Sequence, residues 1–243
     1  IFPNNNKTGK IQGEMWFERG PYSVGGRTRA IMFDPNDPTG KRVFAGGVSG
    51  GLWVNQDPSV STNEWKPLSD FWANTSISCI TYDPNNTQTF YVGTGESCTG
   101  DAAGSGIWKS TDGGATWTNI FTGPTGYNGT IKNGNFYVND IKVRNNGGVS
   151  EVYAGLSGAN VSIQFSDGWL GLYQSGLYKS TDGGATFTRN ASLIANNNAT
   201  VPVSSGLGYS IQQIEIGADN SVWVSTRSSR FSNVDSGGRI FKA

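Results

Sequence analysis

The fold of this chain is decided by two nearly identical stretches, Lys109-Ser-Thr-Asp-Gly-Gly-Ala-Thr-Trp117 and Lys179-Ser-Thr-Asp-Gly-Gly-Ala-Thr-Phe187. Each stretch follows a short segment of a glycine, an aliphatic residue and an aromatic residue, Gly106-Ile-Trp108 and Gly176-Leu-Tyr178. A motif that returns in equivalent surroundings predicts a chain built from one repeated structural unit.

Alignment on the two copies gives a unit of four short strands. The strands are runs of β-branched and aromatic residues, bounded by Gly, Pro, Asn and Asp. The units are expected at residues 27–68 (blade 1), 76–120 (blade 2), 138–190 (blade 3) and, incomplete, 211–243 (blade 4). Blade 1 keeps little of the motif, only Asp57 and Trp65.

The repeated pattern, Ser-x-Asp-x-Gly-x-x-Trp or Phe, is the Asp box, and the chain resembles the Asp-box (BNR-repeat) β-propellers. That group includes sialidases, sortilin-type receptors and xyloglucanase-like glycosidases. The resemblance implies an all-β propeller of four-stranded antiparallel blades. It also implies that the box residues are structural and lie opposite the ligand-binding face. These residues are Ser110, Asp112, Gly114, Trp117, Ser180, Asp182, Gly184 and Phe187.

Residues 16–35, 44–53 and 91–96 also resemble the beginning of large exported propeller proteins of Bacteroidetes. This resemblance implies a secreted or cell-surface protein of the type IX secretion kind, with no activity assigned to most members. Residues 1–13 are expected to form a linker, and residues 14–18 a strand that closes the ring. Either that strand completes blade 4 in a four-bladed ring, or the chain is the N-terminal part of a larger propeller; we favour the larger propeller.

The composition excludes several classes of function. With 18 basic and 18 acidic residues the net charge is zero, which predicts neither nucleic-acid binding nor attraction to an anionic membrane. No apolar run approaches the roughly 20 residues that span a bilayer. The chain has no histidine, so Ser-His and Cys-His nucleophile pairs and His-ligated metal sites are excluded. We expect no cofactor and no catalytic metal.

Two smaller features leave alternatives open. Cys79 and Cys98 fall on neighbouring predicted strands, so they could form a local disulfide or stay two separate buried thiols. The segment Asp34-Pro-Asn-Asp37 could hold a structural calcium ion, although turn chemistry explains the same residues more simply.

Loop lengths predict which end of the propeller carries function. The turns between first and second strands are short, whereas the connections between second and third strands and between blades are long and must share one end. Functional residues concentrate on such loops. The candidates for ligand binding there are the aromatic residues Trp72, Trp169 and Tyr173, with Arg27 and Glu96. The alternative roles are packing for the aromatic residues, an anchor for loop carbonyls for Arg27 and a turn carboxylate for Glu96.

The motifs of the enzyme families are missing. No segment matches the Phe/Tyr-Arg-Ile-Pro of sialidases, and Val48-Ser-Gly-Gly-Leu-Trp53 lacks the catalytic Asp that xyloglucanase-like enzymes carry before this strand. We therefore assign no catalytic residue and expect a non-enzymatic module that binds a glycan or a protein, as part of a larger surface assembly. The alternatives are a glycoside hydrolase, with carboxylates on the loop-rich face or beyond residue 243, and a structural spacer.

Overall fold

The computed structural model describes residues 27–70, 72, 75–96, 104–123, 136–158, 175–193, 209–226, 229–231, 234–236 and 238–243. Over these residues the chain forms β-strands and turns and no helix, which confirms the all-β prediction. No helix in the described ranges is therefore long and apolar enough to cross a membrane.

The strands form a series of antiparallel sheets, each built from consecutive strands of the chain. Blade 1 contains β1 (Thr28–Phe33), β2 (Val43–Gly47), β3 (Gly51–Asn55) and β4 (Lys66–Pro67). Blade 2 contains β5 (Ile77–Asp83), β6 (Asn86–Thr94), β7 (Ile107–Ser110) and β8 (Thr118–Phe121). Blade 3 contains β9 (Phe136–Asn146), β10 (Val149–Gly158), β11 (Gly176–Ser180) and β12 (Thr188–Arg189).

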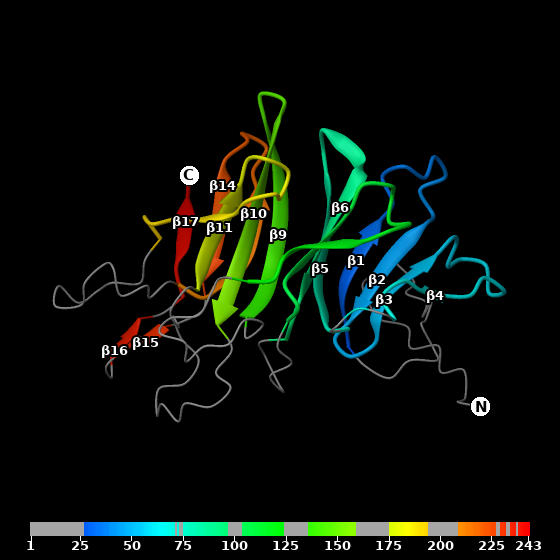
Figure 1. Ribbon diagram of the computed structural model, residues 1–243, viewed down its shortest axis with the longest axis horizontal. Helices are drawn as coiled ribbons and strands as arrows, with labels where there is room; N and C mark the ends of the chain where they lie inside the picture. Colours follow the sequence, from blue (N-terminus) through cyan, green and yellow to red (C-terminus); the bar gives the residue numbers. More distant parts are fainter. Residues whose placement is uncertain are drawn as a thin grey trace, which may run out of the picture.

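Blade 4 contains β13 (Ile211–Ile216), β14 (Val222–Thr226) and β17 (Ile240–Lys242) among the described residues. The sheets stand side by side as a row, with blade 1 at one end and blade 4 at the other (Figure 1). The first strands of successive blades adjoin: β1 contacts β5, β5 contacts β9 and β9 contacts β13. Stacked sheets whose first strands line a common side have the arrangement expected of propeller blades.

The two ends of the sheets differ. The turns between first and second strands and the Asp-box turns lie together at the upper end in Figure 1, here called the turn end. At the opposite end, here called the loop end, the second strands finish and the first strands begin. Glu96 follows β6 there, and Arg27 precedes β1.

The hairpin of blade 3 has a two-residue turn. The first strand, β9, runs to Asn146, and the second strand, β10, begins at Val149. Gly147 and Gly148 connect them with φ of 60° and 90°. Two consecutive residues with positive φ form the turn that best matches strand twist, and glycine adopts it without strain.

The first strand of every blade carries a β-bulge at the same place. The pairing with the second strand shifts at Arg29, Ser78, Asn139 and Gln212. A bulge raises the local twist and turns one side chain out of the regular alternation. All four bulged residues are polar, so each blade presents one polar side chain at the same level of its first strand.

The hydrophobic core is divided between the sheets. One cluster fills the space between blades 1 and 2, a second lies between blades 2 and 3, and a third between blades 3 and 4. The sheets approach closely because glycines stand opposite branched side chains. A Cβ atom on Gly93 would lie 2.8 Å from Cγ1 of Val138, and one on Gly155 would lie 2.5 Å from Cγ2 of Ile211. Glycine thus allows interdigitation that alanine would obstruct.

Several expectations need correction or lie outside the described residues. The connection between β14 and β17, which the sequence predicts to be a long loop, contains a hairpin of β15 (Ser229–Phe231) and β16 (Val234–Ser236). Cys79 is a buried free thiol, in line with one of the two alternatives left open for it. Cys98, residues 1–13, the expected closing strand at 14–18, Trp169 and Tyr173 all lie outside the described ranges.

Candidate functional site

The two Asp boxes have matching hydrogen bonds. Ser110 Oγ accepts a bond from the backbone N–H of Gly114 at 2.9 Å and donates to Asp112 at 2.7 Å. Asp112 Oδ1 also accepts the backbone N–H of Thr116 at 2.9 Å. The second box repeats these bonds, with Ser180 and Asp182 in the places of Ser110 and Asp112.

These bonds explain the state of the box carboxylates. Hydrogen bonds from the side chain and the backbone of Thr116 lower the pKa of Asp112 to about 2, because they favour the ionised form. Gly113 and Gly114 have φ of 69° and 87°, which an L side chain rarely adopts. A carboxylate that is ionised and accepts hydrogen bonds from residues of its own turn is consistent with a structural role.

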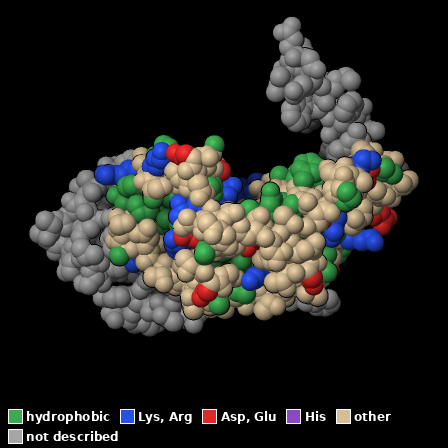
Figure 2. Space-filling model, turned by 90° about the horizontal axis from the view of Figure 1, so that it is seen from above, with side chains coloured by type: hydrophobic (Ala, Val, Ile, Leu, Met, Phe, Trp, Pro, Cys, Tyr) green, Lys and Arg blue, Asp and Glu red, His purple; other side chains and the backbone are tan. Residues whose placement is uncertain are grey.

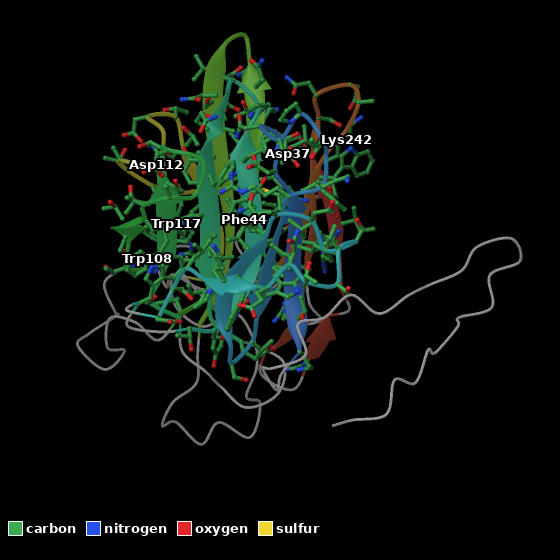
Figure 3. The ribbon with its side chains drawn as sticks, turned by 90° about the vertical axis from the view of Figure 1, so that its right-hand side faces the viewer. Asp37, Phe44, Trp108, Asp112, Trp117 and Lys242 are labelled. Atoms are coloured by element: carbon green, nitrogen blue, oxygen red, sulfur yellow. The ribbon has the colours of Figure 1, made fainter. Side chains whose placement is uncertain are left out.

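The aromatic residue that ends each box packs between blades. Trp117 Nε1 donates to the carbonyl of Gly114 at 3.0 Å, and its ring packs on the cluster between blades 1 and 2. Phe187 packs on the cluster between blades 2 and 3. Trp117 and Trp108 lie one below the other on the same side of blade 2 in Figure 3.

Trp72, a candidate for ligand binding, is placed in the packing between blades 1 and 2. Its ring stacks on Trp108 with centroids 4.3 Å apart and parallel planes. Its edge meets Trp117 at 5.6 Å. Trp72 is therefore half-buried, and these contacts occupy part of the aromatic surface that a sugar would stack on.

Arg27 and Glu96, the two polar candidates, are brought together at the loop end. The Arg27 guanidinium lies 3.3 Å from Glu96 Oε2, and Arg29 donates to the same oxygen at 3.0 Å. The contact joins the first strand of blade 1 to the second strand of blade 2. Arg29 was not predicted as a site residue, although its position two residues after Arg27 places both side chains near one end of the same strand.

Burial differs sharply across this cluster. The Glu96 side chain is 1% exposed, whereas that of Arg27 is 54% exposed. A buried carboxylate beside two guanidinium groups is compensated, and the three described residues of this cluster together carry one formal positive charge in excess. Arg27 is held at one side and open to solvent at the other. It can therefore donate hydrogen bonds to a carboxylate or a hydroxyl group of a ligand.

Another acidic group, which was not predicted from the sequence, lies on the first strand of blade 3. Burial raises the pKa of Asp140 to about 6, against the lowering effect of the backbone N–H of Ile214 and the nearby Lys142. Asp140 Oδ2 accepts that N–H at 2.7 Å, and Oδ1 accepts the N–H of Ile141 at 2.9 Å. Asp140 therefore ties blade 3 to blade 4 and changes its protonation near neutral pH.

The turn at Asp34–Asp37 is occupied by hydrogen bonds. Asp37 accepts backbone N–H groups from Thr39, Lys41 and Arg42, which hold the pKa of Asp37 well below its usual range. Asp34 is paired with Arg42 at 2.9 Å. No cluster of three metal-ligating side chains occurs in the described part of the chain. Turn chemistry accounts for these hydrogen bonds, and the structural calcium ion considered from the sequence stays a prediction.

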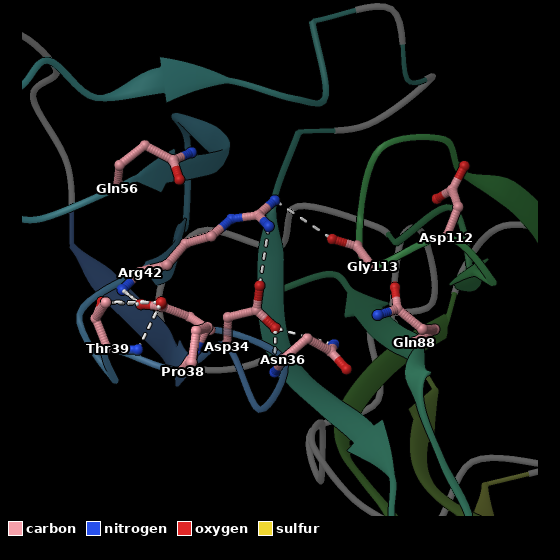
Figure 4. A pocket seen from close by; sticks show the side chains of 10 residues that line it. Asp34, Asn36, Pro38, Thr39, Arg42, Gln56, Gln88, Asp112 and Gly113 are labelled. Atoms are coloured by element: carbon pink, nitrogen blue, oxygen red, sulfur yellow. Dashed lines mark hydrogen bonds and ion pairs between the residues drawn. The ribbon is translucent and has the colours of Figure 1, made fainter.

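A polar pocket of about 510 Å³ opens between this turn and the Asp box of blade 2 (Figure 4). Arg42 reaches across it to the carbonyl of Gly113 at 3.4 Å. The amides of Gln56 and Gln88 line the opposite walls. The surface at the turn end shows basic and acidic side chains scattered among polar groups, with no large field of one sign (Figure 2).

No protein-family model matches the sequence, and comparison with curated proteins finds no match. Solved structures do match the fold. A GH74 enzyme of Niastella koreensis superposes with a TM-score of 0.54 at 24% identity, over 88% of this chain and 28% of that one. An ancestral GH74 enzyme superposes with a TM-score of 0.56 at 17% identity, over 89% of this chain and 24% of that one.

The chain has the β-propeller fold. It spans about a quarter of the length of the propeller enzymes it matches. At these identities the likeness shows the fold and not the activity.

Proposed function

We propose that the chain is a secreted or cell-surface β-propeller module that binds a glycan or protein ligand through its loop end, without catalysing a reaction. The observation that carries the proposal is the ion-pair cluster of Arg27, Arg29 and Glu96. It stands at the loop end, where the connections are long and where scaffolded binding residues tend to lie.

The charge and the exposure of this cluster favour ligand binding over a purely structural role. Arg29 already neutralises Glu96, so Arg27 adds a second cation that is more than half exposed. A guanidinium fixed by a buried partner loses little freedom when it binds a ligand. Sugar hydroxyls, uronic acids and acidic side chains are the groups that it can recognise.

A secreted or surface location is supported by the likeness of residues 16–35 and 44–53 to exported propeller proteins. A composition with only 15% charged residues and many Gly, Asn, Ser and Thr is compatible with a loop-rich extracellular module. In this proposal the Asp boxes hold the blades, and the loop end meets the ligand.

The proposal is tested by screening the full 243-residue chain against immobilised neutral and acidic glycans, followed by calorimetric titration of any ligand found. We expect Arg27→Gln to weaken binding about tenfold or more, because a charge-assisted hydrogen bond is lost. Lys41→Gln, which removes an exposed cation at the turn end, is the matched control and should leave affinity unchanged. Binding that is indifferent to Arg27 would place the ligand elsewhere.

A second candidate function is glycoside hydrolysis, and Asp140 is the observation that favours it. A carboxyl group with a pKa of about 6 can act as a general acid near neutral pH. Hydrolysis also needs a second carboxylate across the sugar. Release of reducing sugar by the wild-type chain, abolished in Asp140→Asn, would favour this candidate; absence of both binding and release would favour a structural spacer.

A further inference from the structure

Each blade packs against the next blade along the chain through one face of its sheet, here called its outgoing face. The three contacts between neighbouring blades share one arrangement on this face. An aromatic residue of the second strand, Phe44, Tyr91 or Tyr153, is buried at each contact. A cation lies over each ring: Arg42 over Phe44 at 5.1 Å, Lys109 over Tyr91 at 5.7 Å and Lys179 over Tyr153 at 5.4 Å. The outgoing face is thus a ring with a cation above it.

At two of these contacts the ring and cation hold the Asp box of the next blade. Tyr91 Oη and Lys109 Nζ donate to the carbonyl of Gly183, at 3.1 and 2.8 Å. Arg42 reaches the equivalent carbonyl of Gly113. The next glycine of each box lies on the ring: a Cβ atom on Gly114 would stand 2.9 Å from Phe44, and one on Gly184 would stand 3.4 Å from Tyr91.

A second element of the contact lies at the bulges of the first strands. Ser78 Oγ donates to the carbonyl of Val138 in the next blade. Asn139 Nδ2 donates in the same way to the carbonyl of Ile211 at 2.6 Å. In both cases the acceptor immediately precedes the bulge of the following blade. The bulged side chain of one blade therefore fixes the position of the next blade's first strand along the strand direction.

Blade 4 carries the same outgoing face. By strand pairing, Trp223 occupies the place of Tyr91 and Tyr153, and Lys242 that of Lys109 and Lys179. Lys242 lies over the Trp223 ring at 5.1 Å. Here, however, Trp223 is 41% exposed, against 0% for Tyr91 and 5% for Tyr153.

Two further residues of this face lack the contacts that their counterparts make. Ile240 corresponds to Ile107 and Leu177, yet it is 73% exposed whereas they are 0% and 3% exposed. Gln212 occupies the bulge position of Ser78 and Asn139, and its Nε2 is buried without a hydrogen-bond partner. A buried donor left without a hydrogen bond costs free energy. The unpaired amide of Gln212 therefore indicates that a partner bound at this face supplies a hydrogen-bond acceptor.

We propose that the outgoing face of blade 4 binds a further Asp-box blade. This face is formed by Gln212, Trp223, Ser225, Ile240 and Lys242. Lys242 donates to the carbonyl of the first box glycine, and Trp223 packs on the second glycine. Ile240 enters the new core, and Gln212 donates to the carbonyl before the bulge of the incoming first strand. The partner is recognised by continuity with an interface that the molecule already uses between its blades.

Blade 1 of a second copy fits this face poorly. Its turn at the box position has Asp57-Pro58-Ser59 and lacks the glycine pair that lets a ring approach. Ser225 also stands where blades 1 to 3 have Gly46, Gly93 and Gly155. The incoming strand must therefore carry a smaller residue than Ile77, Val138 or Ile211 at this point, or Ser225 must be replaced by glycine.

The repeat allows a direct test. Since Lys242 and Lys179 are equivalent, the full chain can be extended after Lys242 by a second copy of residues 180–242, followed by a further copy of residues 180–190. The first of these segments completes blade 4 and adds three strands of a following blade, and the second supplies the Asp box of that following blade. The extension carries phenylalanine in its own copy of position 223, and the first copy carries Ser225→Gly. Hydroxyl-radical footprinting with mass spectrometry then measures the exposure of the single remaining Trp223. The unextended Ser225→Gly chain is the matched reference.

We expect the extension to lower oxidation of Trp223 at least fivefold and to leave oxidation of Trp53, in blade 1, unchanged. Trp223→Ala should lower the urea midpoint of the extended chain and leave that of the unextended chain nearly unaltered. Equal oxidation of Trp223 in both chains would overturn the proposal, whether the extension folds elsewhere or not at all. Protection of Trp223 that rises with protein concentration in the unextended chain would identify a second copy of the chain as the partner. That result would also overturn the proposal.

Discussion

Tyr91 of blade 2 donates a hydrogen bond to the carbonyl of Gly183, in the Asp box of blade 3, at 3.1 Å. The box is therefore more than a turn within its own blade, because it also offers a carbonyl to the blade before it. Burial raises the pKa of the Tyr91 hydroxyl well above its usual range, so it stays a neutral donor across the physiological range.

Tyr91→Phe tests this bond. The substitution keeps the ring and removes the donor, so we expect a loss of about 0.5–1.5 kcal/mol in the free energy of unfolding. Urea unfolding followed by far-UV circular dichroism measures it. Tyr82→Phe, at a residue 38% exposed, is the control and should change little. Equal stability of the two variants would contradict a role for the hydroxyl.

Ser110→Ala tests the hydrogen bonds within the Asp box of blade 2. The serine is buried, and its Oγ accepts the N–H of Gly114 at 2.9 Å. Alanine leaves that N–H buried and unpaired, with an expected cost of about 1–3 kcal/mol. Ser180→Ala should behave alike because its bonds match. Thr39→Ala, in an exposed turn, provides the comparison, and thermal unfolding of all three variants gives the measurement.

Gly93→Ala tests the close approach of blades 2 and 3. The added methyl group would lie 2.6 Å from Cys79 Sγ and 2.8 Å from Val138 Cγ1. We expect a loss of about 1–3 kcal/mol in unfolding free energy from overpacking. Combining it with Val138→Ala should cost less than the sum of the two single changes, because the second makes room for the first. Strict additivity in a double-mutant cycle would argue against the clash.

Asp140 predicts a pH dependence of stability. Its pKa is raised from 3.8 to about 6 by burial, so the folded chain binds the proton more tightly than the unfolded chain. The stabilisation is complete below the unfolded pKa and is lost as pH rises through about 6. The shift corresponds to about 3 kcal/mol. Denaturation curves of Asp140→Asn between pH 4 and pH 8 should lack this component, while the wild-type chain shows it.

The repeat, and through it the fold class, can be predicted from the amino-acid sequence. The two Lys-Ser-Thr-Asp-Gly-Gly stretches are local signals, since their serine, aspartate and glycines form a turn from neighbouring residues alone. The alternation of β-branched and aromatic residues likewise specifies strands. Such short-range chemistry explains why the all-β class could be predicted, while the structural role of Asp112 and Asp182 stays a prediction.

Contacts between side chains of different blades, by contrast, are visible only once the sheets are packed together. Arg27 and Arg29 lie 69 and 67 residues before Glu96, and no local pattern marks their shared carboxylate. Trp72 was a candidate for ligand binding from its loop, yet its place against Trp108 depends on how blades 1 and 2 stack. The raised pKa of Asp140 arises from burial between blades 3 and 4. Burial and pairing depend on the packing of whole sheets, whereas the turns that identify the fold depend only on their own residues.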